Sequence, residues 1–177
     1  MIVNIADLKR VFKIEGNTDD DILFRLVTAA EKTAEKYCDT KLKAVAITEY
    51  HDGDGSDTII LKNIPVNSVT TVHDDVDRAF GADSLKDSEN YVIESWGGIR
   101  LLTDLFTCAK QNVKVVYNAG FEVVPEDIKT AISNLAFASY VEANAGVNAI
   151  VAEDFVYRPE KLRKAAYAIL DQYKRTR

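Results

Sequence analysis

The side chains best suited to chemistry lie together in the segment His51-Asp52-Gly53-Asp54-Gly55-Ser56-Asp57. Three carboxylates within six residues offer the hard oxygen ligands that Ca²⁺ prefers. A hand-type calcium loop, however, has acidic residues at positions one, three and five, a glycine at six and a bidentate glutamate at twelve, and the segment lacks that order. We expect a plain hairpin turn here, with a metal site formed by Asp52, Asp54 and Asp57 as the alternative.

No established catalytic pattern accompanies this segment. The two histidines, His51 and His73, show no metal-ligand spacing. No serine occupies a G-x-S-x-G motif, no phosphate-binding G-x-x-x-x-G-K-[ST] loop is present, and Gly97-Gly98 lies between two strand-like runs instead of opening a helix. The sequence therefore predicts a protein that is not an enzyme and holds no cofactor.

Two other features suit binding surfaces. The acidic run Asp74-Asp75-Val76-Asp77 fits a metal or a basic partner, although a solvated face is the simpler interpretation. Trp96, beside the glycine pair, fits an exposed contact with a partner, but a ring packed against its own sheet is the more common arrangement.

The charge of the chain is divided unevenly. The 177 residues carry a net charge of -6. Residues 158–177 contain seven basic and two acidic side chains, a balance of +5, which leaves -11 on the first 157 residues. An acidic body with a basic end can attract other copies of itself or an acidic partner, and it disfavours wrapping by duplex DNA.

The sequence also bears on location. The N-terminus lacks the pattern of a signal peptide, and no run of about 18 apolar residues is long enough to span a membrane. Cys38 and Cys108 lie far apart and outside any C-x-x-C motif. We expect two reduced, buried thiols in a cytoplasmic product without a membrane span.

Four segments show the periodicity of amphipathic helices, at residues 4–14, 19–38, 125–145 and 159–175. Asp19, Asp20 and Asp21 favour the start of the second helix because carboxylates complement the positive end of the helix dipole. Pro125 and Pro159 suit the first turns of the third and fourth, where a missing N–H costs nothing.

The intervening residues 45–118 have short β-rich runs separated by turn residues. We expect one hairpin between Ile47–Tyr50 and Thr58–Leu61, a second between Tyr91–Glu94 and Ile99–Leu102, and an acidic surface loop at 74–89. The predicted fold is α+β, a single domain over 1–177 in which a small bundle of about four helices carries an inserted antiparallel β subdomain.

One joint between these parts has a recognisable sequence. Residues 112–121, NVKVVYNAGF, run into residues 124–132, VPEDIKTAI. This stretch resembles the strand, Y-x-A-G-[YF] turn and helix start of phage head-to-tail connector (adaptor) proteins. Other segments resemble that family in the same order: Ala29–Cys38, Tyr50–Leu61, Ile64–Val69, Asp154–Tyr157 and Leu170–Arg175. Glu153 departs from the glycine that the family usually has before the segment 154–157.

The resemblance implies a structural subunit of the virion neck, made in the bacterial host cytoplasm. Such subunits form a ring, usually a dodecamer, beneath the portal protein, and DNA passes through the ring toward a stopper or tail protein without sequence-specific binding. The free subunit is expected to be a monomer. The alternatives are a neck stopper or tail-completion protein, or a small metal-binding interaction module.

The basic C-terminal segment, residues 154–177, is the predicted contact with the portal or a neighbouring subunit. Its alternative is an ordinary amphipathic core helix with a solvated basic face. The predicted partner-contact residues are Phe155, Tyr157, Arg158, Lys161, Arg163, Lys164, Tyr173, Lys174 and Arg175.

Overall fold

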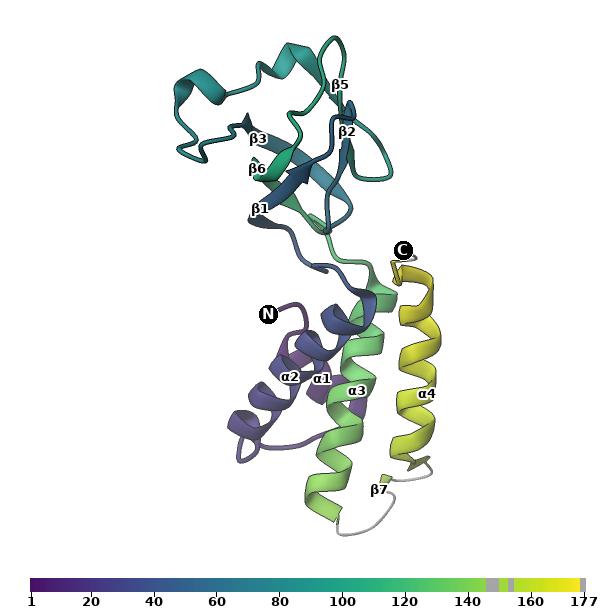
Figure 1. Cartoon of the computed structure of the whole chain (residues 1–177). Coiled ribbons are helices and arrows are strands. Elements are labelled where there is room, and N and C mark those ends of the chain that lie inside the picture. The colour runs from purple at the N-terminus through teal and green to yellow at the C-terminus, as the bar shows by residue number, and fades with distance from the viewer. Residues whose placement is uncertain (146–149, 153–154, 176–177) are drawn as a thin grey trace. The chain divides into compact units, whose positions relative to one another are not determined.

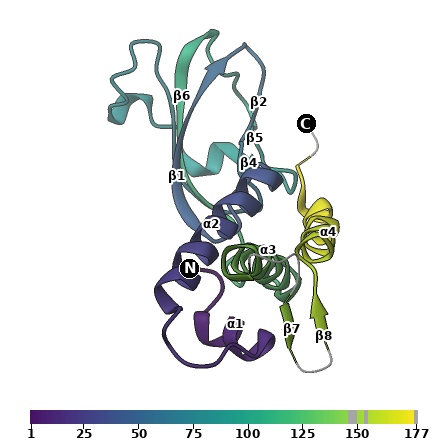
Figure 2. The same ribbon diagram turned by 90° about the horizontal axis from the view of Figure 1, so that it is seen from below.

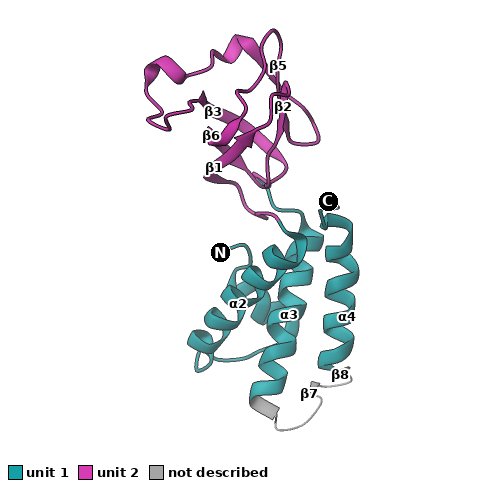
Figure 3. Ribbon diagram, viewed as in Figure 1, with its two compact units in different colours: residues 1–39, 123–177 teal, residues 40–122 magenta. Residues whose placement is uncertain are grey.

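The computed structural model describes residues 1–145, 150–152 and 155–175 (Figure 1). The described residues form four α-helices, two three-stranded antiparallel sheets and a short two-stranded hairpin, so the predicted α+β class is confirmed. They fall into two compact units (Figure 3). The helical unit contains Met1–Asp39 and Val123–Arg177, and the β unit contains Thr40–Glu122.

The helical unit is built around α3 (Glu126–Ala145). Figure 2 looks nearly along this helix and shows α2 (Asp20–Cys38) on one side of it and α4 (Pro159–Leu170) on the other. The short α1 (Ile5–Phe12) packs through Phe12, whose ring stacks on Phe137 of α3 with centroids 3.9 Å apart. The hairpin of β7 (Ile150–Ala152) and β8 (Phe155–Tyr157) joins α3 to α4.

The core of the helical unit follows the predicted apolar faces. Its fully buried side chains on the three longer helices include Leu23, Val27, Ala34 and Cys38 of α2, Ile128, Ala131, Ile132, Ala136, Ala138 and Val141 of α3, and Ala166 and Leu170 of α4. Burying a leucine, isoleucine or valine side chain contributes about 1.5–3 kcal/mol to folding. All three helices are therefore held by their own apolar stripe.

Two helix ends differ from the predicted ones. The first helix ends at Phe12 instead of residue 14, because Lys13 adopts a left-handed conformation with φ of 52° that stops the α-helix. The fourth α-helix ends at Leu170 instead of residue 175, and Asp171–Tyr173 continue as a 3₁₀ turn. Helices often tighten in this way in their last turn.

The β unit consists of two sheets that share one core. The larger sheet has the order β1 (Val45–Gly53), β6 (Ala109–Ala119), β3 (Val66–Asp74), and the smaller has the order β2 (Thr58–Ile60), β5 (Gly98–Leu101), β4 (Tyr91–Ile93). Their inward side chains form one cluster: Ile59, Leu61, Val72, Ile99, Leu101, Phe106, Val113, Val115, Tyr117 and Ala119. Side chains alternate between the two faces of a strand, and the inward ones of β6 from Val113 to Ala119 are all buried.

The first predicted hairpin is wrong, and the second is confirmed. β1 pairs with β6, with Ile47 opposite Tyr117, while β2 pairs with β5, with Ile59 opposite Ile99. The chain leaves one sheet for the other at a bulge beside Gly53, where a Cβ would lie 2.0 Å from the carbonyl oxygen of Thr107. β4 and β5 form the second hairpin as expected.

Among the described residues, no helix is long and apolar enough to cross a membrane.

Candidate interaction surfaces

The aspartate-rich turn uses its carboxylates to hold itself together. Asp52 Oδ1 accepts from the backbone N–H of Gln111 at 2.8 Å, Asp54 Oδ1 from that of Ser56 at 2.9 Å, and Asp57 Oδ1 from Thr58 Oγ1 at 2.8 Å. The hydrogen bonds from Ser56 lower the pKa of Asp54. Within the described ranges, no three side chains suited to metal binding come together. The geometry is that of a structured turn.

A buried carboxylate that sequence reasoning did not single out lies on β1. Glu49 is only 7% exposed. Its Oε1 accepts from Tyr117 Oη at 2.5 Å and Asn63 Nδ2 at 2.8 Å, and its Oε2 accepts from the backbone N–H of Lys62 at 3.0 Å and faces His51 Nε2 at 3.1 Å. One carboxylate thus joins β1 and β6 to the segment that follows β2.

The surroundings of Glu49 favour its charged form. Burial by itself raises the pKa of this carboxyl, but the hydrogen bonds from His51, Tyr117, Lys62 and Asn63 outweigh it and hold the pKa at about 2. Burial, together with the hydrogen bond to Glu49, raises the pKa of Tyr117 well above its ordinary value. The pair therefore stays in the form of a carboxylate and a neutral phenol and serves stability.

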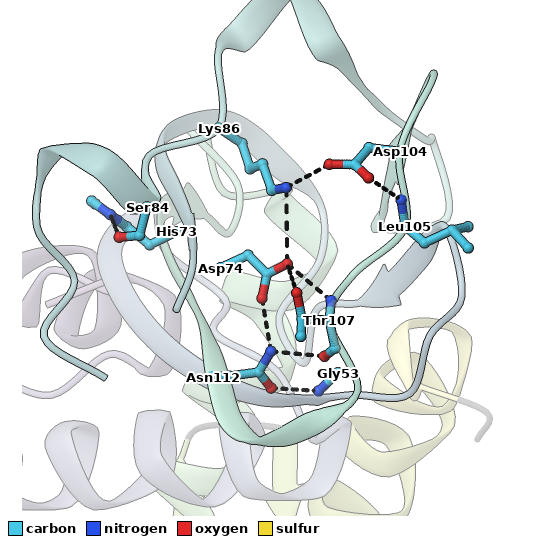
Figure 4. A network of polar contacts seen from close by, with 9 residues as sticks. All are labelled: Gly53, His73, Asp74, Ser84, Lys86, Asp104, Leu105, Thr107 and Asn112. Atoms are coloured by element: carbon cyan, nitrogen blue, oxygen red, sulfur yellow. Dashed lines mark hydrogen bonds and ion pairs between the residues drawn. The ribbon is translucent and has the colours of Figure 1, made fainter. Parts of the chain in front are cut away.

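The acidic run at Asp74 is only partly a solvated face. The Asp74 side chain is 2% exposed, and it accepts from Asn112 Nδ2 at 2.7 Å and from Thr107 N at 2.9 Å (Figure 4). Asn112 Oδ1 in turn accepts from the backbone N–H of Gly53 at 2.9 Å. This network braces the bulge where the chain changes sheets. Asp77, by contrast, is exposed.

Trp96 is both packed on its own sheet and exposed to solvent. A Cβ on Gly98 would lie 2.2 Å from the indole, so the ring lies directly over that glycine. The side chain is nevertheless 49% exposed, and Ile60 on β2, opposite Gly98, is 55% exposed. Exposed apolar groups that are held in place are typical of protein contacts.

The nine predicted contact residues separate into distinct groups. Phe155 and Tyr157 belong to β8, and their side chains lie outside the described residues. Arg158, directly before α4, and Lys161 and Lys164 on it are exposed, with no side-chain partner among the residues that the structure describes. The remaining four make contacts within the helical unit.

These four residues dock α4 and the turn after it. Arg163 binds the carboxylate of Glu142, and Tyr173 Oη donates to Asp127 Oδ2 at 2.6 Å. Lys174 Nζ lies 4.8 Å from the centroid of the Tyr37 ring, and the backbone N–H of Arg175 donates to the carbonyl of Cys38 at 3.1 Å. The fourth helix is thus a core helix with a basic outer edge.

A groove between the N-terminal residues and α3 was not predicted. It has a volume of about 340 Å³, and its lining includes Ile2, Val11 and Phe12 on one side and Lys129 and Ser133 on the other. Val11, at its margin, is 62% exposed. In the sequence these apolar residues look like an ordinary core face, because periodicity alone does not show where a face stays uncovered.

The two thiols have different environments. Cys38 is buried, and burial raises its pKa to about 11. Cys108 is exposed, so the prediction that both are buried is wrong for it. Cys108 lies just before β6 begins at Ala109.

The whole chain is similar to known proteins. A family model described as head completion protein matches residues 1–176. A comparison with curated protein sequences gave no match. Three solved chains share the fold, and each alignment covers 99% of this chain. One is from the neck of a native GTA particle computed with C12 symmetry (TM-score 0.68, 17% identity, 90% of that chain covered), and one is from the neck of an empty GTA particle computed with C6 symmetry (TM-score 0.69, 15% identity, 91% covered). The third is from the virion of a native gene transfer agent (GTA) particle (TM-score 0.70, 18% identity, 91% covered).

The family match spans almost the entire sequence, and it agrees with the resemblance to connector proteins carried by residues 112–132. The chain belongs to the head completion protein family, a family of structural proteins rather than enzymes.

Proposed function

We propose that the chain is a neck subunit of a phage-like particle, which joins the portal of the capsid to the tail and assembles as a ring around the DNA channel. The observation that carries the proposal is the likeness of the whole chain to subunits from the necks of GTA particles, one computed with C12 and one with C6 symmetry. Twelve copies per ring is the expected number. A closed ring requires each copy to offer two different, complementary surfaces to its neighbours.

The charge of the chain supports a channel that DNA passes without being held. Proteins grip duplex DNA mainly through lysine and arginine contacts that release counterions from the phosphates. The chain carries -6 overall, and the β unit has 13 acidic and 8 basic side chains, a balance of -5. A ring of such subunits adds little phosphate attraction to a moving duplex.

The contacts proposed for the C-terminal segment are with the portal or a neighbouring copy. Arg158, Lys161 and Lys164 are the members of the predicted set that are exposed and have no side-chain partner among the described residues. Deletion of the segment does not test them, because α4 contributes buried Ala166 and Leu170 to the core. Substitution of the three exposed cations leaves that core intact.

Electron microscopy of the purified chain mixed with portal-bearing capsids tests the proposal. We expect an added ring of density at the narrow end of the portal. Density that appears only below a ring already present would instead show a stopper or tail-completion protein. Capsids that gain no density from the native chain would contradict both.

A further inference from the structure

Arg158, Lys161 and Lys164 form a basic edge at the start of α4. Lys161 and Lys164, three residues apart, are neighbours on the surface of α4, and Arg158 is the extended residue directly before the helix. None has a side-chain partner within the described ranges, whereas Arg163 on the same helix is paired with Glu142. Cations near the start of a helix gain nothing from the helix dipole, because that end is already positive. Glu160 is the single acidic residue of the first turn.

The same chain carries an acidic surface in its β unit, the acidic loop of residues 75–89. A turn within the loop is fixed by Asp75, which accepts from the backbone N–H groups of Asp77 at 2.9 Å and Phe80 at 2.7 Å. The Phe80 ring then packs on the larger sheet, 5.6 Å from the Tyr50 ring and 5.3 Å from Lys114 Nζ.

The second half of the loop is anchored as well. Ser84 Oγ lies 3.1 Å from His73 Nδ1, and the backbone N–H of Lys86 donates to the carbonyl of Val72 at 2.8 Å. Lys86 Nζ lies 2.8 Å from Asp104 and 3.9 Å from Asp74, as Figure 4 shows. The loop is therefore presented in a defined conformation.

The loop directs uncompensated negative charge to solvent. It contains five acidic residues against Arg78 and Lys86, and Lys86 is already occupied by Asp104. Asp77, Asp83 and Glu89 are exposed, and the structure gives their side chains no partner among the residues it describes. These three carboxylates thus match the three cations of the basic edge in number.

We propose that the basic edge of α4 docks on the acidic loop of a second copy of the chain. The inference rests on the proposed function, since a ring of identical subunits needs two unlike surfaces that fit each other. Charge complementarity supplies the fit and the orientation, and it accelerates the encounter of subunits. The occupant is a second copy because the chain itself provides the matching acidic surface.

Duplex DNA is the rival occupant of the basic edge. Phosphates would suit three cations, but the remainder of the chain is strongly acidic and repels DNA. A second copy presents its acidic loop without such a conflict.

Charge reversal at each surface provides the test. The first variant carries Arg158→Glu, Lys161→Glu and Lys164→Glu, and the second carries Asp77→Lys, Asp83→Lys and Glu89→Lys. Each variant alone places like charges on the basic edge of one copy and the acidic loop of the next. We therefore expect ring occupancy on portal-bearing capsids to fall at least tenfold. An equimolar mixture restores opposite charges at every junction of an alternating ring, so occupancy should recover. A control with Arg25→Glu, Lys32→Glu and Lys36→Glu changes the same charge at exposed positions of α2 and should assemble normally.

The outcomes separate the two proposals. Normal rings from either variant, or folded variants whose mixture fails to recover, would overturn the inference while the neck function stands. If only the first variant lost binding to a 30-base-pair duplex, and ring occupancy did not recover in the mixture, the basic edge would be assigned to DNA. If the native chain adds no ring, the neck function fails, and sedimentation at low salt and high protein concentration then decides the inference: the native chain and the mixture must self-associate more strongly than either variant alone.

Discussion

At the scale of the residue, Glu49 shows how hydrogen bonds can offset the cost of burying a carboxylate. Four donors surround its two oxygens, so the hydrogen bonds lost to water on burial are replaced. Hydrogen bonds to a charged acceptor are about twice as strong as those between neutral groups. The side chain therefore fixes the segment of Lys62 and Asn63 against β1 and β6.

Replacement of Glu49 by glutamine should weaken the fold in a pH-dependent way. The pKa of Glu49 is lowered from 4.5 to about 2 in the folded chain. The carboxylate thus stabilises the fold fully above pH 4.5, and this contribution is lost as the pH falls toward 2. We expect Glu49→Gln to reduce the free energy of unfolding by about 2 kcal/mol at pH 7 and by much less near pH 2. Urea denaturation at both pH values measures the difference.

Glu122→Gln serves as the matched control, because Glu122 is exposed and its side chain makes no hydrogen bond or ion pair within the described residues. This variant should unfold like the native chain at every pH. If Glu49→Gln were as destabilising at pH 2 as at pH 7, the charge of Glu49 would not be the source of its contribution.

At the scale of the element, local sequence patterns were enough to predict the elements whose contacts are local. The helices were predictable because each apolar stripe repeats with the helical period, and Pro125 and Pro159 mark two of their starts. The hairpin of β4 and β5 was predictable because both partners flank one glycine turn.

Local patterns could not predict which strands pair when the partners lie far apart in the sequence. The turn after β1 looks like a hairpin turn, yet β1 pairs with β6 about 65 residues later, because the bulge at Gly53 and the side chain of Asn112 redirect the chain. The contact residues were predicted as one basic segment. The sequence could not show that Arg163 and Tyr173 dock α4 on α3, since that depends on Glu142 and Asp127. Nor could it show that three other cations have no side-chain partner among the described residues.

The connection between β4 and β5 can be tested through its aromatic side chain. Gly98→Ala would place a methyl group where the ring of Trp96 now lies, and the ring can yield because it is the end of a side chain. We expect the emission of Trp96, the single tryptophan of the chain, to shift to the red and acrylamide quenching to increase. Stability should fall by only about 1 kcal/mol, the cost of a lost packing contact.

Gly81→Ala is the matched control, because nothing lies within 4 Å of a Cβ at that glycine and its φ is not positive. Its emission spectrum should equal that of the native chain. Native-like emission from Gly98→Ala would mean that the indole does not occupy the space above the glycine.

At the scale of the whole molecule, the β unit is an insertion whose two ends meet. The backbone N–H of Ala44 donates to the carbonyl of Phe121 at 3.0 Å, and a Cβ on Gly120 would lie 2.5 Å from the carbonyl oxygen of Lys43. Because Gly120 has no Cβ, and adopts a φ of 105°, the outgoing chain can run this close to the incoming one. The folded insertion therefore acts as a short link between α2 and α3.

This arrangement should couple the unfolding of the two units. If the β unit unfolded alone, α2 and α3 would be joined by a flexible loop of about 80 residues, whose closure costs roughly 4 kcal/mol in chain entropy. That penalty is comparable to the stability of a small domain, so we propose that residues 1–177 behave as a single cooperative domain. Trp96 fluorescence reports on the β unit, and the circular dichroism signal at about 222 nm reports mainly on the helices. The two urea transitions should have the same midpoint, as two-state unfolding requires. A fluorescence transition well below the helical one would show that the β unit unfolds independently and would remove the coupling.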